Sequence, residues 1–187
     1  AMIFGGTVTV TGAIAITKTN TNTVTINGNL NGSVAGSTWN NNAGILSYGG
    51  ANAPMATGVL NANTAANTVN YSRANTQAIR AVAYRTLVLS GTSAKTAAGN
   101  ITVNGDFTVS GTASFNGGTS RTHTFNGNWI IDTAAPAPFA FTTASVLNFN
   151  APTPAAATSI GGTTTATLAF NDVNINNTNG VNLNENA

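Results

Sequence analysis

Hydrophobic and polar residues alternate with a period of two along residues 100–111, which read NITVNGDFTVSG. The apolar residues at positions 101, 103, 107 and 109 are separated by small polar residues, and this alternation is typical of a half-buried β-strand. The centre of the stretch recurs: Thr25–Leu30, Thr102–Phe107 and Thr124–Trp129 share the order Thr, apolar, Asn, Gly, Asn or Asp, apolar. The second and third copies begin at positions 102 and 124, a spacing that indicates a stacked β-architecture.

The same period of two predicts short strands over most of the remaining chain. Residues 7–30 read as strands throughout, and the end of the chain alternates cleanly from Leu168 to Leu183. Residues 74–86 are rich in Ala, Gln and Arg, which form helices well, but strand-like sequence flanks them on both sides, so we favour strands there. Pro54 disfavours a central strand at 52–55, and prolines at positions 136, 138, 152 and 154 mark loops.

Asn-Gly between alternating residues is also a strong sign of a tight β-hairpin. A two-residue turn at Asn104-Gly105 would pair Val103 with Asp106, and cross-strand partners share a face of the sheet. Each face would then mix apolar and polar side chains, which excludes the tight hairpin. A three-residue loop that pairs Val103 with Phe107 stays open as an alternative. So does a strand that bends at Gly105 and keeps both apolar residues inside.

We predict an all-β fold, a right-handed parallel β-helix of short irregular coils, with an antiparallel β-sandwich as the alternative. The repeat spacing, the Asn-rich corners and the scarcity of charge favour a solenoid, in which like residues stack. Asn tolerates left-handed backbone, and stacked Asn side chains can hydrogen-bond along the stack. We expect residues 1–187 to form one solenoid segment, an excerpt of a longer repeat protein, with two imperfect modules at about 20–100 and 101–187.

The composition narrows the classes of function. Charged residues make up 5% of the chain, against roughly 25% in an ordinary globular domain. The six cations are scattered, so the net charge of +2 does not indicate nucleic-acid binding. No apolar run approaches the ~20 residues of a membrane-spanning helix, and the first residues lack the pattern of a signal peptide. The chain has no cysteine, which removes disulfides and thiolate metal sites.

The residues that usually carry catalysis are few and dispersed. Glycoside hydrolysis needs two carboxylates about 5–10 Å apart, and the four acids are scattered along the sequence: Asp106, Asp132, Asp172 and Glu185. His123 is the single histidine, and a lone His cannot supply a multi-histidine metal site. Repeated Asp/Gly loops of the calcium-binding kind are absent from the sequence. We therefore expect no enzymatic activity, no cofactor and no metal site.

Two sets of residues are candidates for facing a ligand. The first is a threonine series whose hydroxyl and methyl groups could match ordered water, as in ice binding: Thr19, Thr21, Thr23 and Thr25. Threonine is, however, also an ordinary solvent-facing strand residue. The second set is Tyr48 and Tyr71, which could stack on sugars, although aromatic residues in a β-protein with few charges pack more often in the core.

Residues 68–71, 84–91, 100–107 and 174–181 resemble the repeats of large secreted surface proteins of Bacteroidetes, of the type IX-exported and adhesin-like kind. The chain is similar more loosely to the β-helices of filamentous haemagglutinin and of autotransporters. The resemblance covers residues 20–187. It implies a β-solenoid at the outer surface of a bacterium or outside the cell, with a non-catalytic role as a stalk, fibre or adhesin shaft.

Open terminal coils expose strand edges that invite association. We therefore expect flanking repeats of the same chain or self-association through terminal coils, with surface glycans as a further candidate partner. We expect neither a nucleic-acid partner nor a membrane span. The alternative function is a secreted binding module for glycans or ice, which an exposed row of aromatic side chains or a flat threonine array would favour.

Overall fold

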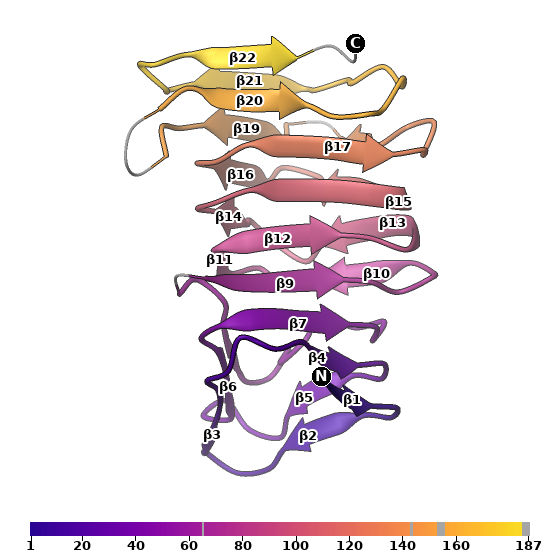
Figure 1. Cartoon of the computed structure of the whole chain (residues 1–187), viewed down its shortest axis with the longest axis vertical. Helices are drawn as coiled ribbons and strands as arrows, with labels where there is room; N and C mark the ends of the chain where they lie inside the picture. The colour runs from indigo at the N-terminus through magenta and orange to yellow at the C-terminus, as the bar shows by residue number, and fades with distance from the viewer. Residues whose placement is uncertain (65, 143, 153–155, 185–187) are drawn as a thin grey trace.

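The computed structural model of the chain describes residues 1–64, 66–142, 144–152 and 156–184. Within these residues the protein is all-β without a helix, and its strands stack as a solenoid of about 8 turns. Every strand pair is parallel. The front strands run left to right as the chain climbs from the indigo end to the yellow end, so the coil is right-handed (Figure 1). The predicted parallel β-helix is confirmed, and the sandwich is excluded.

One long sheet forms the front side of the solenoid (Figure 1). Its strands, in order along the axis, are β1 (Met2–Phe4), β4 (Val24–Ile26), β7 (Gly44–Tyr48), β9 (Asn67–Tyr71), β12 (Thr86–Leu89), the first part of β15 (Phe107–Gly118), β17 (Trp129–Thr133), β20 (Thr158–Gly161) and β22 (Val181–Asn184). This sheet continues through all the coils, so it fixes their stacking.

Shorter sheets form the two other sides of the coil. The second side holds β2 (Val8–Val10), β5 (Leu30–Gly32), β10 (Gln77–Ile79), β13 (Thr92–Ala97), the second part of β15 and β18 (Phe139–Phe141). The third side holds β3 (Ala15–Lys18), β6 (Thr38–Asn41), β8 (Val59–Asn61), β11 (Ala83–Tyr84), β14 (Thr102–Val103), β16 (Thr122–Phe125), β19 (Val146–Phe149) and β21 (Asp172–Ile175). A single bridge between Ala62 and Tyr84 joins β8 to β11 on this side.

Inward side chains of the front sheet stack into one column along the axis, here called the front column. It consists of Met2, Val24, Leu46, Val69, Leu87, Phe107, Trp129, Ile160 and Leu183, each paired in register with the next. The members from Val24 to Ile160 are at most 7% exposed. Successive members lie 18 to 31 residues apart in the sequence. The coils therefore differ in length, and the additional residues lie outside the front strands, which stay in register.

The recurring Asn-Gly motif marks corners of the coil. Val103 and Phe107 flank the corner between β14 and β15 and are both buried, at 0% and 1% exposure. The copy at Thr124–Trp129 forms the same corner one coil later and stacks on it in register. The copy at Thr25–Leu30 lies at a different corner, between β4 and β5. The strand that bends and keeps its apolar residues inside is therefore the correct alternative, and the three-residue hairpin is not.

Other local predictions fare in different ways. The window 74–86 contains two short strands, β10 and β11, which confirms the preference for strands over a helix. Residues 52–55 are outside the strands, as Pro54 predicted.

The prediction that residues 7–30 are strand throughout is wrong, because turns interrupt them at 11–14, 19–23 and 27–29. β11 and β14 pair with each other, Ala83 beside Thr102, so strand pairing crosses the expected boundary between the two modules at about residue 100. Pro154 lies outside the described residues.

Asparagine side chains form ladders between coils, at corners as predicted and also on the strands of the third side. Nδ2 of Asn61 donates to Oδ1 of Asn40 at 2.6 Å, and Nδ2 of Asn126 donates to Oδ1 of Asn104 at the same distance. Two more ladder pairs, 174 with 148 and 176 with 150, follow towards the C-terminal end at 2.9 and 3.1 Å. Amide pairs thus supplement the backbone ladder on the outside of the coil.

Candidate functional site

The predicted threonine series does not form one array. Thr19 and Thr21 are exposed in the turn that follows β3, whereas Thr25 lies on β4 with Thr23 just before it, both half-buried. A flat ice-binding surface would need these hydroxyls on one strand face. β3 ends at Lys18, whose Nζ donates to the backbone oxygen of Asn20 in the following turn at 2.7 Å.

Tyr48 and Tyr71 do not face a ligand, and this prediction is wrong. Both side chains are 0% exposed and pack in the core, with ring centroids 5.8 Å apart. The hydroxyl of Tyr48 donates to the backbone oxygen of Asn52 at 2.7 Å, and the hydroxyls of Tyr71 and Tyr84 pair at 2.7 Å. Burial raises the pKa of Tyr71 and of Tyr84. The hydroxyl bonds order each tyrosine within its own coil, and the contact between the rings of Tyr48 and Tyr71 joins two neighbouring coils.

The described acids lie at separate places, and two of them accept hydrogen bonds from backbone N–H groups of the next coil. Oδ1 of Asp106 accepts from the backbone N–H of Asn128 at 3.1 Å, and Oδ1 of Asp132 accepts from that of Thr163 at 3.0 Å. Asp172 is exposed on β21, and Glu185 lies outside the described residues. Within the described part of the chain, no group of three His, Cys, Asp or Glu side chains could hold a metal ion.

All six cations donate to backbone oxygens, and each has at least one such acceptor in a neighbouring coil. Arg80 spans two of them, Ala56 at 2.7 Å and Gly58 at 3.0 Å. The remaining pairs that join neighbouring coils are Lys18 with Ala43, Arg73 with Gly49, Arg85 with Asn104, Lys95 with Arg73, and Arg121 with Ala97. The cations therefore act as staples between neighbouring coils.

Lys95 is the most enclosed of these staples. Its side chain is 0% exposed, and Nζ donates to the backbone oxygens of Asn75 and Thr92, both at 3.0 Å, and to that of Arg73. Burial, together with the nearby Arg73 guanidinium, lowers the pKa of Lys95 to about 8. Three carbonyl oxygens satisfy the three ammonium protons in a place that water does not reach. Lys18 is a second buried lysine, and burial lowers its pKa as well.

His123 is a core residue. It is 0% exposed, its Nε2 lies 2.9 Å from the backbone oxygen of Gly117, and its Nδ1 accepts from the backbone N–H of Ile101 at 3.3 Å. This pattern assigns the proton to Nε2. Burial lowers the pKa of His123, with the Arg121 charge acting in the same direction and the Gly117 bond against it.

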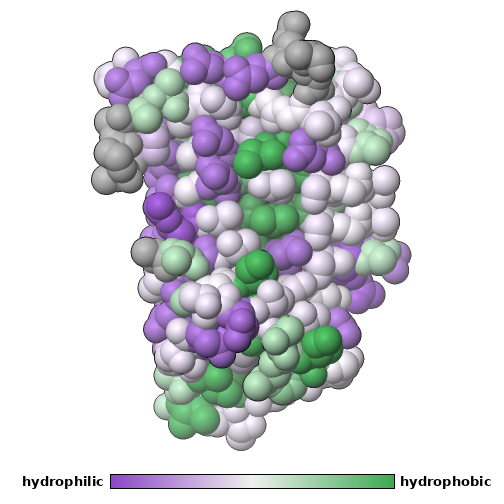
Figure 2. Space-filling view, viewed as in Figure 1, coloured by the Kyte–Doolittle hydropathy of each residue, from purple (hydrophilic) through white to green (hydrophobic). Residues whose placement is uncertain are grey.

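The largest apolar exposure lies at the ends of the solenoid. At the N-terminal end, large apolar side chains of the first coil are open to solvent, among them Met2 (57%), Ile3 (68%) and Ile14 (56%). Figure 2 shows hydrophobic side chains gathered at the lower end of the molecule, where the first coil lies. No described strand precedes β1 in the front sheet. The first coil therefore presents its inner side to solvent.

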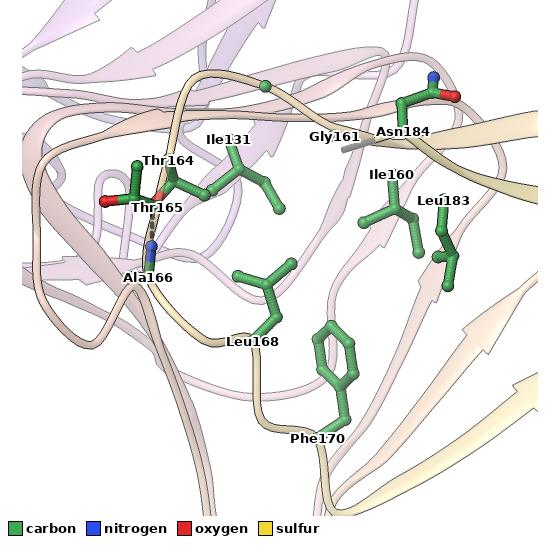
Figure 3. Close-up of a pocket in the computed structure, with 11 residues that line it drawn as sticks. Ile131, Ile160, Gly161, Thr164, Thr165, Ala166, Leu168, Phe170, Leu183 and Asn184 are labelled. Atoms are coloured by element: carbon green, nitrogen blue, oxygen red, sulfur yellow. Dashed lines mark hydrogen bonds between the residues drawn. The ribbon is translucent and has the colours of Figure 1, made fainter. Parts of the chain in front are cut away.

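The C-terminal end is open in the same way and holds a cavity of about 580 Å³. Leu183 is 76% exposed and Ile175 is 58% exposed. Figure 3 shows the apolar side chains that converge on the cavity from three successive levels of the solenoid, those of β17, β20 and β22: Ile131, Ile160, Leu168, Phe170 and Leu183. Gly162 also lines the cavity and packs tightly on the coil below, because a Cβ atom there would lie 2.4 Å from the backbone oxygen of Ile131.

Sequence reasoning missed the buried lysines and the end cavity. Lys18 and Lys95 alternate in phase with the inward residues Ile16 and Ala97, which was a usable signal. The carbonyl partners of the lysines carry no mark in the sequence, because any residue supplies a backbone oxygen. The open ends were expected, but their residues depend on where each strand pairs.

Comparisons with protein-family models, with curated proteins and with solved structures gave no match to this chain. The described residues contain no helix that is long and apolar enough to span a membrane.

Proposed function

We propose that this chain is a structural segment of a bacterial extracellular surface protein: a non-catalytic stalk, fibre or adhesin shaft. The observation that carries the proposal is the uninterrupted front sheet, whose inward column is buried along its length and exposed at both ends. In a solenoid, each coil contributes its own burial and its interface with the next, so length adds without a change of design. A shaft needs this property.

The chemistry of the surface supports the same role. Hydroxyl and amide groups rather than charges cover the outside, and the Asn ladders use much of their hydrogen-bonding capacity on one another. The tyrosines and tryptophans lie inside. Sugar recognition through stacking would need exposed aromatic rings, and ice binding would need aligned threonines, so the observations favour the shaft over the binding module.

Cell fractionation tests this proposal. An antiserum against the chain is used on outer-surface, cytoplasmic and culture-medium fractions of the source bacterium, under both native and denaturing conditions. We expect the protein in the outer-surface fraction, in a native species far larger than 18.7 kDa. A soluble species near that mass in the medium would contradict the shaft and bring the glycan- or ice-binding module forward. A cytoplasmic marker protein controls for lysis.

A further inference from the structure

The third side of the solenoid is interrupted between β8 and β11, inside the body of the molecule. The strand pairs on either side of this place, β6 with β8 and β11 with β14, are continuous ladders. Among the described residues, β8 and β11 themselves share only the bridge between Ala62 and Tyr84, where the N–H of Arg85 donates to the oxygen of Ala62 at 2.7 Å. Beside Val59 and Leu60 the two coils form a groove with a volume of about 540 Å³.

This groove, here called the β8 groove, has an uncharged lining. None of the described residues that line it carries a charge. Its polar residues include four asparagines, at positions 40, 42, 61 and 63. Its apolar residues include Val59 and Val82, and Val59 is 41% exposed. The groove therefore offers amide groups next to aliphatic side chains, without a lining charge that would select an ion.

An amide ladder ends in the groove with an unused acceptor. Nδ2 of Asn40 donates to Oγ1 of Thr17 at 3.0 Å, and Nδ2 of Asn61 donates to Oδ1 of Asn40 at 2.6 Å. The next position in this row is Ala83, and an alanine side chain cannot continue the ladder. Oδ1 of Asn61 therefore has no hydrogen-bond donor within the described residues.

A second row of amides leaves donors beside this acceptor. Oδ1 of Asn63 accepts from Nδ2 of Asn104 at 2.8 Å, whereas Nδ2 of Asn63 donates to no described residue. The side chain of Asn42, one coil below, makes no hydrogen bond in the described part of the chain either. The three amides with unused groups, at positions 42, 61 and 63, are all exposed. The groove thus presents both donors and acceptors to a ligand.

We propose that the β8 groove binds a short segment of a neutral glycan. A sugar hydroxyl both donates and accepts, so neighbouring hydroxyls can pair with Oδ1 of Asn61 and Nδ2 of Asn63 together. The C–H face of a sugar ring packs on aliphatic groups such as Val59. The volume of the groove lies within the range of small-molecule sites, roughly 300–1,000 Å³. The proposal rests on the proposed shaft function for its biological setting, because such a ligand makes the shaft adhesive.

The ends of the groove disfavour an extended peptide as its ligand. An unpaired strand edge such as that of β8 is a usual place for a peptide to add a strand. Just before β8, however, Arg80 crosses between the two coils and donates to the oxygens of Ala56 at 2.7 Å and Gly58 at 3.0 Å. The bridge at Ala62 closes the other end. An added peptide strand would have to break one of these contacts, whereas a compact sugar segment leaves both in place.

Nuclear magnetic resonance of the ¹⁵N-labelled chain tests the proposal with defined probes. Cellotriose, maltotriose and N-acetylated chitotriose are the neutral probes, and trigalacturonate is the acidic one. We expect at least one neutral probe to shift the side-chain amide signals of Asn61 and Asn63 in a saturable way, and trigalacturonate to bind more weakly. The affinity should be low, because no aromatic ring is among the described residues that line the groove.

Three results of this titration would overturn the proposal. The first is the absence of any shift with all the neutral probes. The second is binding of trigalacturonate that equals or exceeds that of the neutral probes. The third is a shift of the groove signals by an asparagine-rich peptide alone, which would make the groove a peptide site.

The variant Ala83→Asn should close the groove from within. The new amide continues the row from Asn61 and takes up its free Oδ1, so binding of the neutral probe should weaken by about tenfold or more. Thr102→Asn is the matched control, because Thr102 is the next position in the same row and lies outside the groove. It should bind the probe as the unmodified chain does. Undiminished binding by Ala83→Asn, or an equal loss in both variants, would overturn the site. Thermal melting verifies that both variants fold.

The two proposals fail separately. A purified chain that binds none of the neutral probes, in a protein found on the outer surface, leaves the shaft intact and removes the glycan site. Binding of a neutral probe by a protein found only in the cytoplasm removes the surface shaft and leaves the site.

Discussion

Asn104 and Asn126 lie one above the other at the same corner of successive coils, and Nδ2 of Asn126 donates to Oδ1 of Asn104 at 2.6 Å. Asn104 in turn donates to Oδ1 of Asn63 at 2.8 Å. Three coils that are distant in sequence are thus joined by amides on the outside, at the corner where the apolar residues turn inward. These hydrogen bonds hold the corners of the three coils together on the outside, where the apolar core makes no contact.

Removing the central amide of this ladder should weaken the fold. Asn104→Ala loses both side-chain bonds, so the free energy of unfolding should fall by about 1–2 kcal/mol, measured by urea denaturation. Asn174→Ala is the matched control, because Asn174 makes a single ladder bond, to Asn148 at 2.9 Å, and should cost about half as much. Equal effects of the two variants would contradict a ladder whose contributions add.

Close stacking at the corner makes Gly127 sensitive to any side chain. A Cβ atom at this position would lie 2.3 Å from the backbone oxygen of Gly105 in the coil below. Gly127→Ala should therefore lower the free energy of unfolding by about 1–3 kcal/mol, because the two backbones must move apart. At Gly6 a Cβ meets nothing within 4 Å, so Gly6→Ala should change it by less than about 0.5 kcal/mol. A harmless Gly127→Ala would show that the corner is looser than described.

The buried ammonium of Lys95 predicts a stability that depends on alkaline pH. The folded-state pKa is about 8 and the ordinary value is 10.5, so between these values the unfolded chain holds more protons than the folded one. The free energy of unfolding should then rise with pH across this window and level off above it. Lys95→Met removes the group, and its urea midpoint should depend less on pH over the same range. An identical slope in both proteins would show that Lys95 does not titrate there.

Burial of His123 predicts that the free energy of unfolding also depends on pH on the acidic side. Because burial lowers its folded-state pKa below 6.5, the unfolded chain takes up a proton first on acidification. Stability from this residue is therefore complete above pH 6.5 and is lost as the pH falls below it. Leucine suits the inward position, since Leu147 is its partner in the next coil. His123→Leu loses the bond from Ile101 but should show a flatter thermal-melting profile between neutral and acidic pH.

Side-chain parity excluded the tight hairpin from the sequence alone, and the repeat spacing and scarcity of charge then favoured the coil. Val103 and Phe107 could share an interior only across a longer loop or a bend, and the structure has the bend. The location of each corner was not predictable in the same way. Two copies of the same motif, at Thr25–Leu30 and Thr102–Phe107, turn different corners. The motif specifies a bend, and strand pairing with neighbouring coils decides which corner it forms.

The prediction that Tyr48 and Tyr71 face a ligand failed because it relied on residue type and disregarded the inward–outward alternation along their strands. Tyr48 follows Leu46 by two positions and Tyr71 follows Val69 by two, so the alternation placed both tyrosines inside. The threonine series failed for another reason: alternation between Thr and Asn has no apolar phase to hold a strand against a core. Only Thr25, which alternates with Val24 and Ile26, lies on a strand.

The uneven length of the coils has a mechanical consequence. Hydrogen bonds between parallel strands run along the axis, so a pull on the two ends loads the coils in series, and the weakest end coil detaches first. Each detached coil releases 18 to 31 residues, which extend to about 60–100 Å. Under tension this protein would therefore lengthen in unequal steps and dissipate work at each one, while the coils that remain keep their register.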